Sequence, residues 1–399
     1  MRVVVIGKGI VGASAAYHLS RRGVAVTVID AGLAGQATEA GAGIVCPWVD
    51  HEDDPAWYEL ARAAARRYPE RAGYARVGAL LVAEERAELE PVRRLLEARY
   101  PDAPEMGEIT EVPDPAALFP PLAPGLSALR VPGAARVDGR AVRDALLADA
   151  VAGGVALLHG HAELLPDGTV LLHHNHPSTG TPHKQHKQGE LGEQRGPGEP
   201  HGRRGPRRPG LTGEEGESRG AGSGVPVPAD AVIVAAGAWS GQVCASLGIA
   251  LPVTPLRGQI VHAVLDGVDT SGWPIVLPRR GPYLLGFPGS RVVVGATRED
   301  AGFDARVTVA GLAEVLSAGV RLAPGLAGAS LAETRSGLRP MVDGERPLIA
   351  RLTAKVVVAT GLSAYGLTAG PYAGMLATSL VLGETPEIDL TPYAVVPGV

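Results

Sequence analysis

The sequence predicts an α/β fold, and the order of three elements within residues 1–30 carries this prediction. Val3 to Ile6 form a continuous β-branched run, which is typical of a strand buried on both faces. A helical stretch follows from Ala13 to Arg22, and Val24 to Ile29 form a second strand, which ends at Asp30. A strand, a helix and a strand in this order form a βαβ unit, from which parallel sheets are built.

A glycine motif connects the first strand to the helix. Gly7, Gly9 and Gly12 have the spacing GxGxxG. Gly7 permits a tight turn, Gly9 lets a pyrophosphate approach the backbone, and Gly12 lets the helix pack close to the strands. The helix N-terminus offers N–H groups to phosphates, and Asp30 can accept hydrogen bonds from a ribose diol. The motif therefore predicts a dinucleotide site, with a glycine-rich turn that binds no ligand as the alternative.

Small residues fill the stretch from Ala31 to Ile44, directly after the second strand. Small side chains allow backbone N–H groups to face a flat ring closely. A dinucleotide unit for NAD needs no such segment, whereas a flavin lying against the backbone does. The stretch therefore favours a flavin nucleotide, and a flexible Gly/Ala loop is the alternative.

Length and composition limit the other possibilities. The 399 residues suffice for two domains of ordinary size, and the 45% of hydrophobic residues can form a sizeable core. A net charge of −5 argues against nucleic acid or an acidic membrane surface as the main partner. Cys46 and Cys244 give neither a disulfide framework nor a metal cluster, which fits a cytoplasmic setting. No apolar run reaches the roughly 18 residues of a transmembrane segment.

The region after the small residues is expected to be mixed. Residues 57–68 and 84–100 have the pattern of amphipathic helices, and residues 76–83 between them are predicted to form a strand. Proline residues punctuate the connection from Pro113 to Pro124. Residues 141–152 are predicted to form another helix, which two glycines end.

Residues 173–224 interrupt this pattern with a tract rich in His, Arg and Gly. The tract is almost without apolar residues and cannot bury surface to offset the entropy of ordering. We therefore expect a disordered, low-complexity surface insert. A metal-binding histidine tract and an arginine contact with nucleic acid are the alternatives.

Strands are predicted to dominate the second half of the chain. Residues 155–158 are predicted to form a strand, and residues 231–240 a buried strand that ends in a glycine turn. Four further strands are expected to form an antiparallel sheet, and they comprise residues 259–264, 275–277, 283–286 and 292–295. A helix over residues 310–322 follows, and near the end a strand from Val356, a glycine-rich turn and a helix over residues 372–382 are predicted.

The chain resembles the FAD-dependent amine and amino-acid oxidoreductases that include D-amino-acid oxidase, glycine oxidase and bacterial D-amino-acid dehydrogenase. The motifs behind this resemblance are GxGxxG, the small-residue segment, the GATxE pattern at 295–299 with GFD at 302–304, and the G-x-R-P stretch at 337–340. The resemblance covers nearly the whole chain except the insert.

The resemblance implies a Rossmann-like FAD-binding domain with an interleaved α+β substrate domain on a mostly antiparallel sheet. Residues 1–45, 131–250 and 339–399 are expected to form the FAD-binding domain. Residues 46–130 and 251–338 are expected to form the substrate domain.

The expected FAD contacts come from the glycine motif, the small-residue segment, a position after the strand at 155–158, and two glycine-rich turns. The N–H groups of the last turn and the dipole of its helix would stabilise negative charge on the reduced ring. The predicted FAD-binding residues are Gly7, Gly9, Ile10, Val11, Gly12, Asp30, Ala31, Ala37, Thr38, Ala42, Gly43, Ile44, Ala162, Gly237, Gly361, Leu362, Ser363, Ala364, Tyr365, Gly366, Leu367 and Thr368.

By resemblance, Arg339 is expected to bind a substrate carboxylate, because a guanidinium can grip a carboxylate with two hydrogen bonds. A structural arginine that binds backbone carbonyls is the alternative. Tyr283, Trp48 and Tyr365 are the other candidate substrate-binding residues. Cys46, beside Trp48, is expected to be a buried small residue rather than a nucleophile, because no partner base is evident.

The chain departs from its relatives in the last glycine-rich turn. Leu362 stands where members often have a histidine, and Ala364 where glycine oxidase-like members have a second arginine. No catalytic residue and no metal ligand is assigned, since the flavin performs the chemistry.

The resulting hypothesis is an FAD-dependent oxidoreductase that oxidises the CH–NH bond of a small amino acid of the D-amino-acid or glycine type. Hydride would pass to flavin N5, and the imine would hydrolyse to a keto acid and ammonia. Oxygen or another acceptor would then take the electrons. The alternatives are oxidation of an N-methyl amine or a 2-hydroxy acid, and a non-enzymatic dinucleotide-binding or metal-binding module.

Overall fold

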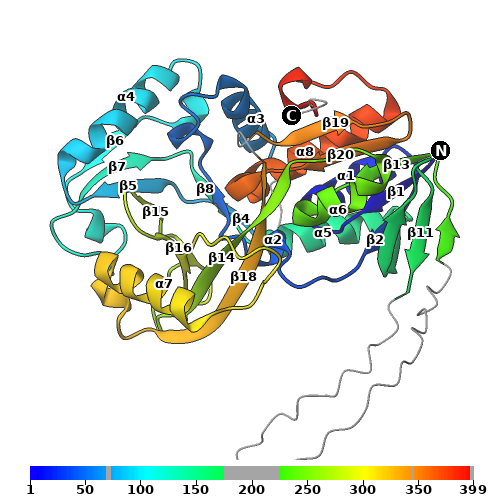
Figure 1. The fold of residues 1–399 in the computed structure, drawn as a ribbon. Helices are drawn as coiled ribbons and strands as arrows, with labels where there is room; N and C mark the ends of the chain where they lie inside the picture. The colour runs from blue at the N-terminus through cyan, green and yellow to red at the C-terminus, as the bar shows by residue number, and fades with distance from the viewer. Residues whose placement is uncertain (69–72, 175–223, 343–345, 396–399) are drawn as a thin grey trace, which may run out of the picture. The chain divides into compact units, whose positions relative to one another are not determined.

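Two large β-sheets organise the part of the chain that the computed structural model describes, residues 1–68, 73–174, 224–342 and 346–395 (Figure 1). Both sheets belong to one compact unit, Met1–His174 with Gly224–Val399. The proposed division of this unit into two interleaved domains stays a prediction. The tract at 175–223 lies outside the described residues.

The first sheet has six strands in the order β19-β20-β13-β1-β2-β9. Strand β1 pairs in parallel with β2 and with β13, as the βαβ pattern predicts. Val3, Val4 and Val5 of β1 are at most 1% exposed, because neighbouring strands and helices cover both faces. The strands are β1 (Arg2–Ile6), β2 (Ala25–Asp30), β9 (Ala156–His159), β13 (Ala231–Val234), β19 (Leu348–Arg351) and β20 (Val356–Thr360).

Three helices pack together beside this sheet: α1 (Ile10–Ser20), α5 (Gly139–Ala152) and α8 (Gly366–Leu382). Small residues allow the close contact, since a Cβ at Gly374 of α8 would lie 2.4 Å from the Val11 carbonyl oxygen. The predicted start of α8 at residue 372 is wrong. The helix begins six residues earlier and includes Pro371, because its first turns are buried and held by packing rather than by local propensity.

The second sheet has eight strands in the order β18-β14-β17-β16-β15-β5-β7-β6. Its pairs are antiparallel except β15 with β5, so the predicted mostly antiparallel sheet is confirmed. Helix α7 (Val309–Leu322) contacts β14 and β17, and its predicted position is confirmed. The strands are β5 (Ala79–Ala83), β6 (Thr110–Val112), β7 (Ser127–Val131), β14 (Val253–Val264), β15 (Ile275–Pro278), β16 (Tyr283–Phe287), β17 (Arg291–Gly295) and β18 (Ser330–Val342).

Strands β14 and β18 are the longest partners in this sheet, and they reach toward the six-stranded sheet (Figure 1). Strand β18 contacts the short helix α2 (Ala37–Ala40), and both strands contact the 3₁₀ turn η5 (Gly237–Trp239). Only residues 259–264 of β14 were predicted to form a strand, and β18 was not predicted. Their polar and glycine residues hide the alternation of a half-buried strand.

Smaller elements complete the described fold. Helix α3 (Pro55–Arg66) matches a predicted helix, whereas α4 (Glu90–Arg99) begins six residues later than predicted, after a 3₁₀ turn. The predicted strand at 76–83 is two strands, because Gly78, with φ of +77°, separates β4 (Tyr74–Arg76) from β5. The remaining elements are β3 (Ile44–Val45), β8 (Ala135–Val137), β10 (His161–Leu164), β11 (Val170–His173), β12 (Val225–Val227) and α6 (Ser240–Cys244).

No helix among the described residues is both long and apolar enough to cross a bilayer.

Candidate active site

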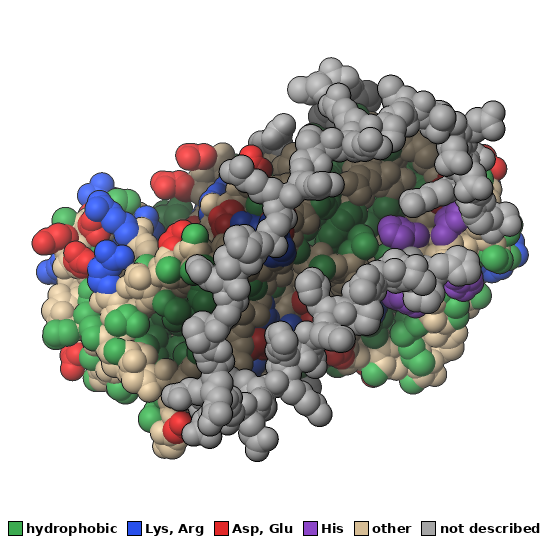
Figure 2. All heavy atoms as spheres, turned by 60° about the horizontal axis from the view of Figure 1, so that its bottom comes forward, with side chains coloured by type: hydrophobic (Ala, Val, Ile, Leu, Met, Phe, Trp, Pro, Cys, Tyr) green, Lys and Arg blue, Asp and Glu red, His purple; other side chains and the backbone are tan. Residues whose placement is uncertain are grey.

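A cavity of about 480 Å³ lies between the six-stranded sheet and the β14–β18 pair. The residues at or just after the carboxyl ends of β1, β2, β13 and β20 line one side of it, as expected for a ligand site in an open parallel sheet. Gly258 and Ile260 of β14 and Leu338 and Arg339 of β18 line the other side. The face of the molecule in Figure 2 is hollowed at its middle, where hydrophobic side chains are exposed. This size and this mixture of apolar walls with a few polar groups are typical of a small-molecule site.

The glycine motif forms the turn at the end of β1. Gly7 has φ of +102°, and a Cβ there would lie 2.4 Å from the Ala235 carbonyl oxygen. A Cβ at Gly12 would lie 1.9 Å from the Gly7 carbonyl oxygen, so any side chain at Gly12 would push α1 away from β1. Gly7 and Gly9 line the cavity, whereas Gly12 does not. Gly12 therefore has the packing role that the motif predicts.

Asp30 lines the cavity at the end of β2. One carboxylate oxygen accepts a hydrogen bond from the Lys8 backbone N–H at 2.9 Å. The other accepts from the Gly32 N–H at 2.8 Å and from the Gln36 side chain at 3.0 Å. These bonds fix the carboxylate, which has about four lone-pair sites and retains acceptor capacity for a ribose hydroxyl.

Thr38 ties the small-residue segment to the start of α1. Its hydroxyl accepts a hydrogen bond from the Ile10 backbone N–H at 3.0 Å. This bond uses one of the donors that a helix N-terminus leaves unsatisfied. The segment is thereby held along the cavity, which Ala37, Thr38, Ala42, Gly43 and Ile44 all line.

Arg339 lies on the opposite side of the cavity. One terminal nitrogen of its guanidinium donates to the Thr297 carbonyl oxygen at 3.1 Å. No carboxylate of the described residues forms an ion pair with it, and no other arginine or lysine is among the described residues that line the cavity. A guanidinium has five N–H donors, so most of this side chain's donors are free to bind an anion.

Tyr283 of β16 lines the cavity near Arg339. Burial raises the pKa of its hydroxyl, and the positive charge and hydrogen bonding of Arg339 oppose this effect. The phenol is therefore neutral at ordinary pH and offers one O–H donor beside the guanidinium.

Comparison with known proteins identifies the kind of site. The family described as "FAD dependent oxidoreductase" (DAO) matches residues 2–185 and 203–380. The chain belongs to this family. It is therefore an FAD-dependent oxidoreductase, and the predicted family, fold and cofactor are confirmed.

Two related proteins and one solved structure are similar to this flavoenzyme over nearly its whole length. An uncharacterized oxidoreductase of Bacillus subtilis (strain 168), YurR, is 38% identical over 408 residues, which cover 98% of this chain and 97% of the relative. Iminodiacetate oxidase from Chelativorans sp. BNC1 is 42% identical, with a TM-score of 0.83 over 98% of both chains. A glycine oxidase of Pseudomonas aeruginosa (strain PAO1) is 27% identical over 98% of both chains.

Two glycines of the flavoenzyme border open space in the cavity. Gly237 after β13 and Gly366 at the start of α8 both line it, and a Cβ at either position would meet no atom within 4 Å. The first residues of α8 also line it, so the positive end of this helix dipole is available to stabilise negative charge on a bound ring. Together with the glycine turn and Asp30, these residues fit the cofactor.

Most predicted FAD-binding residues are brought together at the cavity, and their contacts with FAD stay predictions. Besides the residues already placed, Ala31, Ala162 and the turn at 361–364 line it. Tyr365 and Thr368 do not. The Thr368 hydroxyl donates to the Ile44 carbonyl oxygen at 2.8 Å, so Thr368 supports the small-residue segment from behind.

Two predicted substrate-binding residues, Trp48 and Tyr365, are also absent from the cavity lining. Trp48 is 2% exposed and packs in the core under the eight-stranded sheet. The Tyr365 hydroxyl donates to the Asp50 carboxylate, and its ring lies 4.6 Å from that of His51 and 5.3 Å from that of Trp57. Burial raises the pKa of Tyr365 well above its usual value, so it acts as a neutral donor.

Residues at both ends of the cavity were not predicted from the sequence. At the end near β10 these are His161, Glu163 and Trp239. At the other end, Gly258 and Gly337 are opposite each other in the β14–β18 pair and line the cavity. A Cβ at Gly258 would lie 2.5 Å from the Arg339 guanidinium, so this glycine makes room for that side chain. A glycine in each strand is visible in the sequence, but only the register shows that they are opposite.

Proposed function

We propose that this FAD enzyme oxidises the CH–NH bond of a small amino acid whose carboxylate binds Arg339. The observation that carries the proposal is the unpaired guanidinium of Arg339 in the same cavity as the nucleotide-binding turn. When bound, FAD supplies a hydride acceptor for the C–H bond beside the substrate nitrogen.

Arg339 would bind the substrate carboxylate through charge-assisted hydrogen bonds, and Tyr283 would donate a further one. Because the Thr297 carbonyl already fixes one nitrogen of the guanidinium, the bound carboxylate would have a defined orientation. The apolar neighbours Ile260, Leu338 and Pro340 would exclude water from the reacting carbon.

The amine is expected to bind in its neutral form. The acidic residues among the described cavity-lining residues are Asp30, at the end of β2, and Glu163, on β10, both near the predicted nucleotide site. Neither belongs to the strands that carry Arg339 and Tyr283, so none of the described carboxylates that line the cavity lies on these strands to bind an ammonium. A neutral amine keeps the lone pair that must help expel the hydride, and no protein base is then needed.

The relatives support an amine as the substrate. Iminodiacetate oxidase, at 42% identity, takes its name from a secondary amine with two carboxymethyl groups. We therefore include N-substituted glycines among the candidate substrates, next to glycine and D-amino acids. A substrate end without an acidic partner for an amine would also accept a 2-hydroxy acid, which has a hydroxyl in place of the amine. The 2-hydroxy acids are therefore the second candidate class of substrate.

Anaerobic mixing of the oxidised enzyme with a substrate panel tests the proposal. The panel contains glycine, sarcosine, iminodiacetate, D-alanine, L-alanine and glycolate, and the visible absorbance of oxidised FAD is followed. At least one amino acid is expected to bleach the chromophore. Bleaching by glycolate alone would replace the proposal with the 2-hydroxy acid, and no bleaching by any member would reject both.

A further inference from the structure

The Arg339 guanidinium lies flat against the backbone of β14. A Cβ at Gly258 would lie 2.5 Å from each of three guanidinium atoms, Cζ, Nη1 and Nη2. The guanidinium is planar. A point at this equal distance from all three atoms lies above their plane and not beside its edge. One flat face of the guanidinium therefore covers Gly258.

The backbone at Gly258 does not itself require a glycine. The residue lies inside β14, and its φ is not positive. Glycine weakens a strand interior, because it loses more conformational freedom on folding than any other residue. The three atoms nearest to a Cβ at this position all belong to Arg339. The guanidinium is therefore what a side chain at position 258 would displace.

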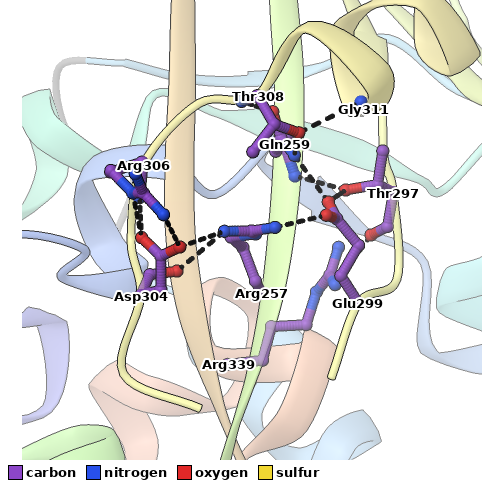
Figure 3. Close-up of polar contacts among 9 residues, drawn as sticks. All are labelled: Arg257, Gln259, Thr297, Glu299, Asp304, Arg306, Thr308, Gly311 and Arg339. Atoms are coloured by element: carbon purple, nitrogen blue, oxygen red, sulfur yellow. Dashed lines mark hydrogen bonds and ion pairs between the residues drawn. The ribbon is translucent and has the colours of Figure 1, made fainter. Parts of the chain in front are cut away.

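Thr297 holds one edge of the same guanidinium. Its carbonyl oxygen accepts a hydrogen bond from Nη1 of Arg339 at 3.1 Å. Thr297 is 1% exposed, and its hydroxyl accepts from the Gln259 backbone N–H at 2.9 Å and donates to the Glu299 carboxylate at 2.5 Å (Figure 3). These bonds fix Thr297, so the guanidinium is supported on one face by Gly258 and held at one edge by a fixed carbonyl.

We propose that Gly258 is a positioning residue for substrate binding: because it has no side chain, the Arg339 guanidinium lies flat on β14 and keeps its remaining edge donors aligned for the substrate carboxylate. This inference rests on the proposed role of Arg339 in binding the substrate.

The geometry of the guanidinium explains why its seat matters. Its N–H groups point outward in its plane, so two parallel hydrogen bonds form only with a carboxylate that approaches an edge in that plane. A side chain at position 258 would lift or tilt the plane and break the bond to Thr297. The far end of Arg339 is flexible and can move without the backbone. The cost would therefore fall on substrate affinity and not on FAD binding.

Acetate is the probe, because it has a carboxylate and no C–H bond beside nitrogen. Its binding is measured from the change in the visible absorbance of the FAD-loaded enzyme. Gly258→Ala is expected to weaken acetate binding by at least about tenfold, as for the loss of a hydrogen bond to a charged group, and to leave the dissociation constant of FAD unchanged. Unchanged acetate binding, or equal weakening of acetate and FAD, would overturn the proposal.

The double variant Gly258→Ala/Arg339→Ala separates positioning from structural damage. Without a guanidinium to displace, the added methyl group is expected to leave acetate affinity within about twofold of that of Arg339→Ala alone. A role of Gly258 in packing the strands predicts a further loss that adds to the first, and this result would overturn the proposal.

Gly272→Ala is the matched control. A Cβ at Gly272 meets no atom within 4 Å, and its φ is not positive. This variant is expected to bind acetate as the unaltered enzyme does, and a loss equal to that of Gly258→Ala would overturn the proposal. If Gly258→Ala does not fold, the double variant decides: recovery of folding supports the proposal, and a double variant that also fails to fold overturns it.

Arg339→Ala distinguishes failure of this inference from failure of the proposed function. If Arg339→Ala binds acetate as well as the unaltered enzyme, the proposed carboxylate site is wrong. If Arg339→Ala loses acetate while Gly258→Ala retains it, only the positioning role is wrong.

Discussion

The two ends of the cavity are built in different ways. At the predicted nucleotide end, Gly7, Gly9 and Asp30 come from one continuous βαβ unit, the glycines acting through backbone geometry and Asp30 through its carboxylate. At the proposed substrate end, Tyr283 and Arg339 come from separate strands and act through side chains. The first end depends on local chain geometry, whereas the second depends on strand register.

This difference predicts that substitutions at the two ends of the cavity have different effects. A change in the glycine turn should abolish cofactor binding and with it all activity. A change at the substrate end should leave the cofactor in place and alter affinity, stability or pH dependence.

The largest expected effect is that of Gly12→Val. A Cβ at this position would lie 1.9 Å from the Gly7 carbonyl oxygen, and backbone atoms cannot yield as a flexible side chain would. We expect loss of FAD from the purified protein, measured by its visible absorbance relative to protein. Gly272→Val is the control, because a Cβ there meets nothing within 4 Å. A Gly12→Val protein that retained FAD at full stoichiometry would contradict the packing role of this glycine.

His262 of β14, in the eight-stranded sheet, is expected to make the stability of the protein depend on pH. Its ring is 3% exposed, and neither nitrogen has a hydrogen-bond partner among the described residues. Burial, with help from the charges of Arg335 and Arg291, lowers its pKa from 6.5 to about 4. Between these values the unfolded chain binds more protons at His262 than the folded protein does. Stability is therefore lost as the pH falls through this window, by up to roughly 3 kcal/mol.

His262→Leu removes this contribution. Its thermal midpoint is expected to fall less between pH 7 and pH 5 than that of the unaltered protein. Equal falls in the two proteins would show that His262 does not titrate in this way.

Tyr365→Phe is expected to have the smallest effect. It removes the hydrogen bond to Asp50 and keeps the ring packing against His51 and Trp57. The free energy of unfolding should fall by about 1 kcal/mol, measured by denaturant unfolding. FAD content should not change, because Tyr365 does not line the cavity. A loss of FAD in this variant would place Tyr365 at the cofactor instead.

The contrast between the two ends also explains what the sequence could predict. The βαβ unit, Asp30 and the short apolar strands β5, β15, β16 and β17 of the second sheet follow from local patterns, because glycine spacing and apolar runs determine them. Strands β6, β7 and β18 and the first half of β14 were not predicted. Arg339 was found through a motif in the resemblance. Trp48 and Tyr365 do not line the cavity, and the sequence does not show toward which side of a loop an aromatic ring turns. The position of Arg339 over Gly258, on the face of the β14–β18 pair that lines the cavity, requires the register of the two strands, which the sequence does not show.

The central claim is that Arg339 binds the substrate carboxylate while the cofactor is held elsewhere in the same cavity. Arg339→Ala tests it most directly, with the dissociation constants of FAD and of acetate measured on the same preparation. We expect acetate binding to weaken by roughly 100-fold, as for the loss of a charged hydrogen-bonding partner, and FAD binding to change little. Equal weakening of both, or no change in acetate binding, would contradict the account.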